Sequence, residues 1–201
     1  MSLRIYGNRL IKTLAGQDTR PTPARVREAL FNIWQGKIAG CRWLDLCAGS
    51  GAMGAEALCR GASLVIGIEQ SPRACAVIQA NWERVATADQ RFHVLRGAVV
   101  KQLKPLVGRS FALIYFDPPY ASQLYQPVLT AIDHYHLLTP TAELAVEHRR
   151  QPRRPDQLVN HSDWQCPPAL QLCRQKNYGG TALSFYQLNL ESSNPQPEPG
   201  D

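Results

Sequence analysis

The sequence predicts an α/β fold, and two observations lead to this class. Apolar segments with strand character alternate with segments of helical length along most of the 201 residues, a pattern typical of βαβ units. Near the end of the chain, two more strand-like segments flank KNYGGT, whose glycines favour a tight turn between antiparallel strands. Together they indicate a Rossmann-like, doubly wound, mostly parallel seven-stranded sheet with a C-terminal antiparallel hairpin.

The predicted strands are short apolar runs bounded by glycine, proline or polar residues. FALIYF, residues 111–116, is one such run. We expect parallel strands at 42–47, 64–68, 91–95, 111–116 and 143–147, and the two strands of the hairpin at 169–175 and 182–188.

The first predicted helix opens at Thr22 and Pro23, because Thr is a favoured N-cap and Pro suits the first helical position. Val26, Leu30 and Trp34 then recur on one face at helical spacing. The other helices are expected between successive strands, at 52–60, 72–85, 98–107 and 122–137.

The composition is that of a globular protein, with 44% hydrophobic and 19% charged residues, and the length suits one domain. No run of about 18 apolar residues is present, and MSLRI at the start lacks the apolar core of a signal peptide, so we expect neither a membrane span nor export. The six cysteines and five histidines show no metal-ligand spacing. We therefore expect free thiols, no metal site and a cytoplasmic monomer.

The positive charge is concentrated near the N-terminus. Residues 1–42 hold eight Lys or Arg against two acidic residues, a net charge of +6, and the remainder of the chain is neutral. Such a cluster is either a solvated face or an arm that binds a polyanion, and its place outside the predicted core favours the arm. We expect a basic arm at 1–21, one domain at 22–189 and a disordered, proline-rich tail at 190–201. A second basic cluster at 149–154 would extend the basic surface or form a loop.

The first candidate site is WLDLCAGSGAMGAEAL, residues 43–58, where a strand leads through a glycine-rich turn into a helix. Its G-x-G-x-x-G spacing also occurs in dinucleotide-binding folds. A carboxylate at Asp45, however, would repel a pyrophosphate and pair with an ammonium group. Glu69 ends the next strand, where it can bind both hydroxyls of a ribose. These features favour S-adenosylmethionine, with NAD or a turn without a ligand as alternatives.

The second candidate site is DPPY, residues 117–120, directly after the strand at 111–116. In a doubly wound sheet, ligands bind beyond the carboxyl ends of the strands, so this segment would face the glycine-rich turn. Asp117 and the carbonyl of Pro118 can accept hydrogen bonds from an exocyclic amine, and the prolines hold both acceptors rigid. Tyr120 can stack on an extruded base. The alternative is a stiff turn with a surface Asp and a packed Tyr.

Both motifs resemble those of class I S-adenosylmethionine-dependent amino-methyltransferases. TRPTPARVREALFNIW, residues 19–34, is similar to the segment that precedes the core of the RsmD family, and KNYGGTALSFY, residues 176–186, is similar to its K-x-Y-G-x-T ending. The resemblance covers roughly residues 4–188. It implies methylation of N2 of a guanine in 16S ribosomal RNA, either free or within a small-subunit assembly particle.

Motifs and resemblance together give three sets of expected site residues. The catalytic set is Asp117, Pro118 and Tyr120; the cofactor-binding set is Asp45, Ala48, Gly49, Ser50, Gly51, Gly54, Glu69, Gln70 and Ala98; and the RNA-binding set is Arg9, Lys12, Arg20, Thr22, Arg25, Arg27 and Tyr178. Tyr178 either lines the base pocket or only closes the hairpin.

The chain departs from the family pattern at three places. Gly97 stands where the family usually has an Asp that contacts adenine, Cys47 replaces a common aromatic residue, and the basic N-terminal hairpin RIYGNRLIKTL is short. Three alternatives therefore stay open: an amino-methyltransferase that acts on adenine N6 of DNA or on a protein glutamine, a non-catalytic RNA-binding protein with a degenerate pocket, and a dehydrogenase. The last offers no explanation of DPPY.

Overall fold

The structure of the protein, a computed structural model, describes residues 2–14, 24–150 and 164–189. The predicted N-cap Thr22, the boundary at residue 21 and the tail 190–201 lie outside these ranges.

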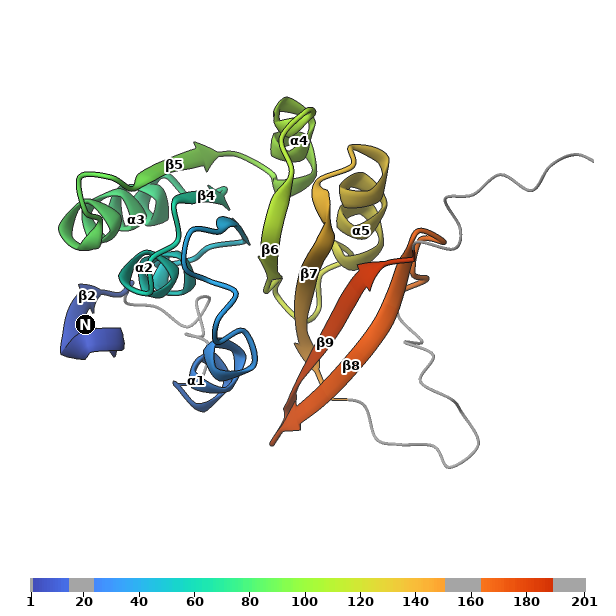
Figure 1. Ribbon diagram of the computed structural model, residues 1–201, viewed down its shortest axis with the longest axis horizontal. Coiled ribbons are helices and arrows are strands. Elements are labelled where there is room, and N and C mark those ends of the chain that lie inside the picture. Colours follow the sequence, from blue (N-terminus) through green and yellow to red (C-terminus); the bar gives the residue numbers. More distant parts are fainter. Residues whose placement is uncertain (1, 15–23, 151–163, 190–201) are drawn as a thin grey trace, which may run out of the picture.

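A seven-stranded sheet in the order β5-β4-β3-β6-β7-β9-β8 forms the centre of the molecule (Figure 1). The pairs from β5 to β7 are parallel, whereas β9 is antiparallel to both β7 and β8. This arrangement confirms the predicted doubly wound sheet with its closing hairpin. The strands are β3 (Arg42–Leu46), β4 (Leu64–Glu69), β5 (Arg91–Arg96), β6 (Phe111–Phe116), β7 (Leu138–Arg149), β8 (Leu170–Tyr178) and β9 (Thr181–Leu188).

One strand differs clearly from its predicted bounds. β7 begins at Leu138, five residues earlier than expected, because its register against β6 shifts between Phe111 and Leu113. Pro140 lies in the intervening segment, and a proline is tolerated in a sheet at such irregularities but not in a regular central ladder. Its presence makes the start of β7 look like a loop in the sequence.

The helices cover both faces of the sheet (Figure 1). One apolar cluster contains Leu30, Met53 and Ile78 from the first three helices, and the other contains Leu103 and Ile132 from the last two. The helix expected at 122–137 is shorter, because the chain first turns at Ser122 and then reaches a positive φ of 51° at His136. The elements are α1 (Ala24–Ile33), α2 (Ala52–Cys59), α3 (Pro72–Val85), α4 (Val99–Leu103), η2 (Lys104–Leu106) and α5 (Tyr125–His134).

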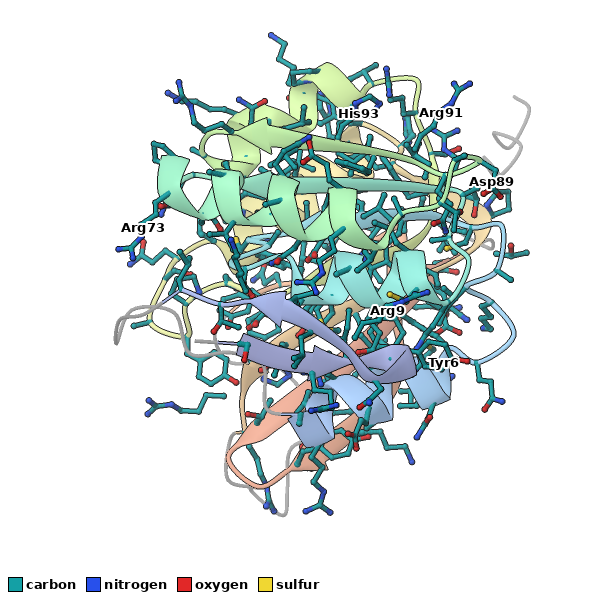
Figure 2. All side chains as sticks on the ribbon, turned by 90° about the vertical axis from the view of Figure 1, so that its left-hand side faces the viewer. Tyr6, Arg9, Arg73, Asp89, Arg91 and His93 are labelled. Carbon is teal, nitrogen blue, oxygen red and sulfur yellow. The ribbon has the colours of Figure 1, made fainter. Side chains whose placement is uncertain are left out.

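The N-terminal residues form a separate two-stranded hairpin of β1 (Ser2–Ile5), η1 (Tyr6–Asn8) and β2 (Arg9–Lys12). It packs against the domain, since Ile5 and Ile11 are buried in the same apolar cluster as α2 and α3. Figure 2 shows the hairpin and α3 on one face of the molecule, with Arg9 on the hairpin and Arg73 at one end of α3. No helix within the described ranges is long and apolar enough to span a membrane.

Candidate active site

A cavity of about 710 Å³ lies at the carboxyl edge of the sheet, a volume typical of small-molecule sites. Its lining includes the segments that leave β3, β4, β5 and β6. β3 and β6 are direct parallel neighbours, with Leu46 opposite Phe116, so the two candidate motifs leave the sheet side by side. Asp45 and Asp117 therefore line one cavity.

The lining of the cavity is acidic. Its described residues include four carboxylates, Asp45, Glu69, Asp117 and Glu147, and neither Lys nor Arg. The thiol of Cys47 lies among these carboxylates: burial, together with the charges of Glu69, Asp117 and Asp45, raises its pKa to about 12. The site therefore favours a cationic ligand and disfavours a pyrophosphate.

Asp45 is a buried carboxylate whose side chain points from β3 towards the first turn of α2. The residue is 1% exposed, and its Oδ2 accepts a hydrogen bond of 3.0 Å from the amide of Gly54. Burial raises the pKa of Asp45 to about 8, against the lowering effect of the Gly54 amide and with a smaller raising effect from Glu69. A cation bound in the cavity would restore the charged form, which is what the ammonium group of an amino acid ligand provides.

Glu69 fixes the glycine-rich turn from the end of β4. Its Oε2 accepts from the amide of Gly49 at 2.9 Å, and its Oε1 accepts from the amide of Ser71 at 2.8 Å. Gly49 has a φ of 56°, and a Cβ at this position would meet no other atom within 4 Å. Gly49 therefore leaves room for a ligand beside the backbone, as the sequence predicts.

Gly51 and Gly54, which are also expected at the cofactor, are not among the residues that line the cavity. A Cβ on Gly51 would lie 2.8 Å from Trp82 Nε1, and a Cβ on Gly54 would lie 2.3 Å from Trp82 Cζ2. The Trp82 indole also donates to the carbonyl of Gly51 at 2.8 Å. Both glycines make room for a buried tryptophan of α3, and only indirectly shape the ligand site. No motif in the sequence marks Trp82, which lies 28 residues after Gly54.

The other expected cofactor residues Ala48, Ser50, Gln70 and Ala98 all line the cavity. Gly97 lines it too, with a φ of 151°, and a Cβ there would lie 2.5 Å from Gln102 Nε2. A side chain at position 97 is disfavoured by the backbone conformation, whereas the contact with Gln102 involves only the flexible end of a side chain.

The expected catalytic residues Asp117, Pro118 and Tyr120 line the cavity on the β6 side. The amide of Asp117 donates to the carbonyl of Leu46 at 3.3 Å, which holds the start of DPPY against β3. The Tyr120 hydroxyl donates to Glu147 Oε1 at 3.0 Å and lies 3.0 Å from Thr181 Oγ1. Glu147 and Thr181 were not predicted as site residues, because they lie on β7 and β9, far from DPPY in sequence.

The end of the N-terminal hairpin reaches the cavity. Thr13 and Leu14 line it, and the buried side chain of Asn81 fixes the preceding residue. Asn81 accepts from the amide of Lys12 at 2.8 Å and donates to the carbonyls of Lys12 and Ser50, both at 2.9 Å. Asn81, a further residue without a sequence signal, thus joins the hairpin to the glycine-rich turn.

The expected RNA-binding residues of the N-terminal segment differ in their exposure to solvent. Arg9, Lys12 and Arg25 are exposed, and Arg20 and Thr22 lie outside the described ranges. Arg27 corrects the prediction: it is 3% exposed, its Nε lies 2.8 Å from Glu56 Oε2, and its Nη2 donates to the carbonyl of Arg4. It joins α1, α2 and the hairpin and does not face solvent.

Tyr178 does not belong to the lining of the cavity, although it ends β8 at the same edge of the sheet. It is half-buried and packs against the apolar cluster of α1 and the hairpin. Of the two roles considered for Tyr178, the structure favours closing the β8–β9 hairpin.

Comparisons with known proteins agree with this architecture. Residues 3–187 match the family described as Conserved hypothetical protein 95. The Bacillus subtilis protein with the provisional name rRNA methyltransferase YlbH is 32% identical and aligns over 89% of this chain and 93% of its own length. Ribosomal RNA small subunit methyltransferase D of Escherichia coli is 29% identical, over 86% of this chain and 81% of its own.

A solved structure is also similar. The Escherichia coli protein provisionally described as methyltransferase yhhF superposes with a TM-score of 0.76 at 27% identity, covering 94% of this chain and 98% of its own. The strand order and the acidic cavity, together with this neighbour, define an α/β methyltransferase.

Within that class, the chain belongs to the Conserved hypothetical protein 95 family, since the family model spans nearly all of it. The resemblance to the RsmD family seen in the sequence is confirmed by the relatives that carry the name small subunit methyltransferase D.

Proposed function

We propose that this protein transfers a methyl group from S-adenosylmethionine to the exocyclic N2 amine of a guanine in 16S ribosomal RNA. The observation that supports it most directly is the single acidic cavity shared by the Asp45 and Asp117 segments. The names of the relatives support ribosomal RNA of the small subunit as the substrate class. The proposal includes a monomer that acts in the cytoplasm, where ribosomal subunits assemble.

The residues on the β3 and β4 side fit the proposed cofactor. Asp45 is a buried carboxylate that gains by pairing with an ammonium group, and Gly49 leaves space beside the backbone. Glu69 would bind the ribose hydroxyls with the accepting capacity that remains after its two amide bonds. When bound, S-adenosylmethionine supplies an electrophilic methyl group on a cationic sulfur. The acidic lining suits that charge.

The residues on the β6 side fit an amine as the target. The lone pair of an exocyclic amine is delocalised into the base, so the amine is a weak nucleophile. Asp117 and the Pro118 carbonyl would accept its two N–H groups, orient it and favour a pyramidal nitrogen. Because methylation itself acidifies the amine, Asp117 acts either as an acceptor alone or as the group that takes the proton. Tyr120 would stack on the extruded base.

The basic N-terminal segment would bind the phosphates of the RNA. Lys12 and Arg25 are exposed, and Thr13 and Leu14 bring the end of the hairpin to the cavity. Backbone contacts of this kind position a nucleic acid without reading its sequence.

The test is methyl transfer to defined substrates. Protein and S-adenosylmethionine with a radioactive methyl group are incubated with 16S ribosomal RNA, or with small-subunit particles, from a strain that lacks this gene. Digestion to nucleosides should give labelled N2-methylguanosine from at least one of the two substrates. Transfer of the label to adenine N6 of DNA or to a protein glutamine, in parallel incubations with those substrates, would instead replace guanine N2 as the proposed target. Binding of RNA without any transfer would instead favour a non-catalytic protein.

A further inference from the structure

Glu147 is a buried carboxylate at the cavity to which neither the motifs nor the proposed reaction gives a role. It lies on β7, is 2% exposed and lines the cavity beside DPPY. Two tyrosine hydroxyls donate to it: Tyr115 to Oε2 at 2.5 Å and Tyr120 to Oε1 at 3.0 Å. Burial of a carboxylate is costly unless hydrogen bonds compensate, so these two donors are part of what keeps Glu147 in place.

The hydroxyl of Tyr120 has a second partner on another strand. Thr181 Oγ1 lies 3.0 Å away, and Thr181 begins β9 opposite Arg149 of β7. The DPPY segment is a loop at one end of the Tyr120 side chain, whereas two sheet strands hold the other end. The backbone holds one end of the Tyr120 ring, and the contacts of the hydroxyl with Glu147 and Thr181 hold the other. The ring therefore keeps one orientation, although DPPY itself is not part of a strand.

The protonation state of Tyr120 agrees with this role. Burial raises the pKa of Tyr120, and the nearby charges of Glu147 and Asp117 raise it further, against a lowering effect from Thr181. The hydroxyl therefore stays protonated at neutral pH and can donate to Glu147. Because its hydroxyl is directed to Glu147 and Thr181, Tyr120 offers the cavity its ring and not a competing polar group.

We propose that Glu147 is a positioning residue for the target base: with Thr181 it fixes the ring of Tyr120 so that a stacked guanine presents its amine to Asp117. This inference rests on the proposed function, because it assigns Tyr120 to the base. According to this inference, residues of β7 and β9 also set the orientation of the substrate.

The test uses substitutions that keep side-chain shape. Tyr120→Phe removes only the hydroxyl, Glu147→Gln replaces one accepting oxygen with an amide group, and Thr181→Val removes the second partner. We expect kcat for guanine methylation to fall roughly 10- to 100-fold in Tyr120→Phe and Glu147→Gln, the range that a small misplacement of reacting groups produces. The Kd of S-adenosylmethionine should stay within about twofold, because these residues lie on the other side of the cavity.

The double variant separates positioning from a general loss of stability. If Glu147 acts through Tyr120, Glu147→Gln combined with Tyr120→Phe should be no slower than the slower single variant. Tyr186→Phe is the matched control: Tyr186 is also a buried tyrosine, but its hydroxyl accepts from Trp164 at 3.3 Å and does not line the cavity. Its kcat should match that of the wild-type protein.

Each outcome decides between the explanations. Effects of Glu147→Gln and Tyr120→Phe that multiply in the double variant, or variants with wild-type kcat, would overturn the inference while leaving guanine methylation intact. A parallel loss of S-adenosylmethionine affinity would also overturn it, because it would show a general distortion. If Glu147→Gln does not fold, Thr181→Val with Tyr120→Phe provides the same comparison. A wild-type protein that methylates no guanine would reject the proposed function and this inference with it.

Discussion

The two sides of the cavity are built from different kinds of contact. On the β3–β4 side, Asp45 and Glu69 accept hydrogen bonds from the amides of Gly54, Gly49 and Ser71. On the β6–β7 side, the contacts join side chains, because Glu147 accepts from tyrosine hydroxyls and Tyr120 also meets Thr181. The β3–β4 side therefore depends on backbone shape, and the β6–β7 side depends on the hydroxyl and carboxyl groups of particular side chains.

This difference predicts how substitutions on each side of the cavity affect binding and methyl transfer. A substitution on the backbone-built side should act through strain, packing or charge and should reach the cofactor. A substitution on the side-chain-built side should reach the target base and leave the cofactor in place.

Asp117→Ala should remove most methyl transfer, because one of the two acceptors that orient the amine is lost. We expect kcat to fall about 10²- to 10³-fold, as when one preorganised hydrogen-bonding group is removed from an enzyme site. Calorimetry should show nearly unchanged binding of S-adenosylmethionine. Asp89→Ala, on an exposed turn before β5, is the matched control and should keep wild-type turnover. Unchanged turnover in Asp117→Ala would reject the role of Asp117.

Binding of S-adenosylmethionine should tighten as the pH rises towards about 8. In the protein without ligand, burial raises the pKa of Asp45 to about 8, so below that pH a proton must leave before the carboxylate pairs with an ammonium group. The Kd should fall roughly tenfold per pH unit between about 6 and 8, and then level off. Calorimetric titrations across this range measure it.

The raised pKa of Asp45 also makes the stability of the fold depend on pH. Since the folded pKa of Asp45 lies above its ordinary value of 3.8, charging Asp45 opposes folding as the pH rises from there to about 8. Asp45→Asn should therefore be more stable than the wild-type protein at pH 8, yet bind S-adenosylmethionine weakly and without the pH dependence. A wild-type Kd that is independent of pH would contradict the proposed pairing.

Gly54→Ala should destabilise the fold and weaken the cofactor side together. The new Cβ would lie 2.3 Å from the Trp82 ring, so the tryptophan or α2 must move. Overpacking of this kind costs about 1–3 kcal/mol, which denaturant unfolding can measure. Gly180→Ala is the control, because a Cβ there meets nothing within 4 Å. Equal stability of the two variants would show that Trp82 does not constrain the turn.

Charge reversal at Lys12 and Arg25 should weaken RNA binding modestly and leave both sides of the cavity intact. For each lost phosphate contact, the slope of log affinity against log salt concentration should decrease by about 0.7–0.9. Filter binding over a range of salt concentrations measures this slope. Arg91→Glu, at the opposite edge of the sheet where β5 begins, should leave it unchanged. If the slope of log affinity against log salt concentration is the same in all variants, Lys12 and Arg25 do not contact the RNA.

The same division explains what could be predicted from the sequence. Asp45, Gly49 and Glu69 were recognisable because each lies close to the carboxyl end of a predicted strand. Glu147 and Thr181 were not, because Glu147 meets Tyr120 only once β6 and β7 pair, and Thr181 only once β9 has also paired with β7. Arg27 was misjudged for a similar reason: its burial depends on Glu56, 29 residues further along the chain.

The central claim is that one cavity holds the methyl donor on the β3–β4 side with its reactive end directed at Asp117. A crystal structure with S-adenosylhomocysteine, the proposed product, tests it most directly. We predict the amino group at Asp45, the ribose at Glu69 and the sulfur facing the Asp117–Tyr120 segment. A ligand whose sulfur is turned away from Asp117, or that binds outside this cavity, would contradict the account.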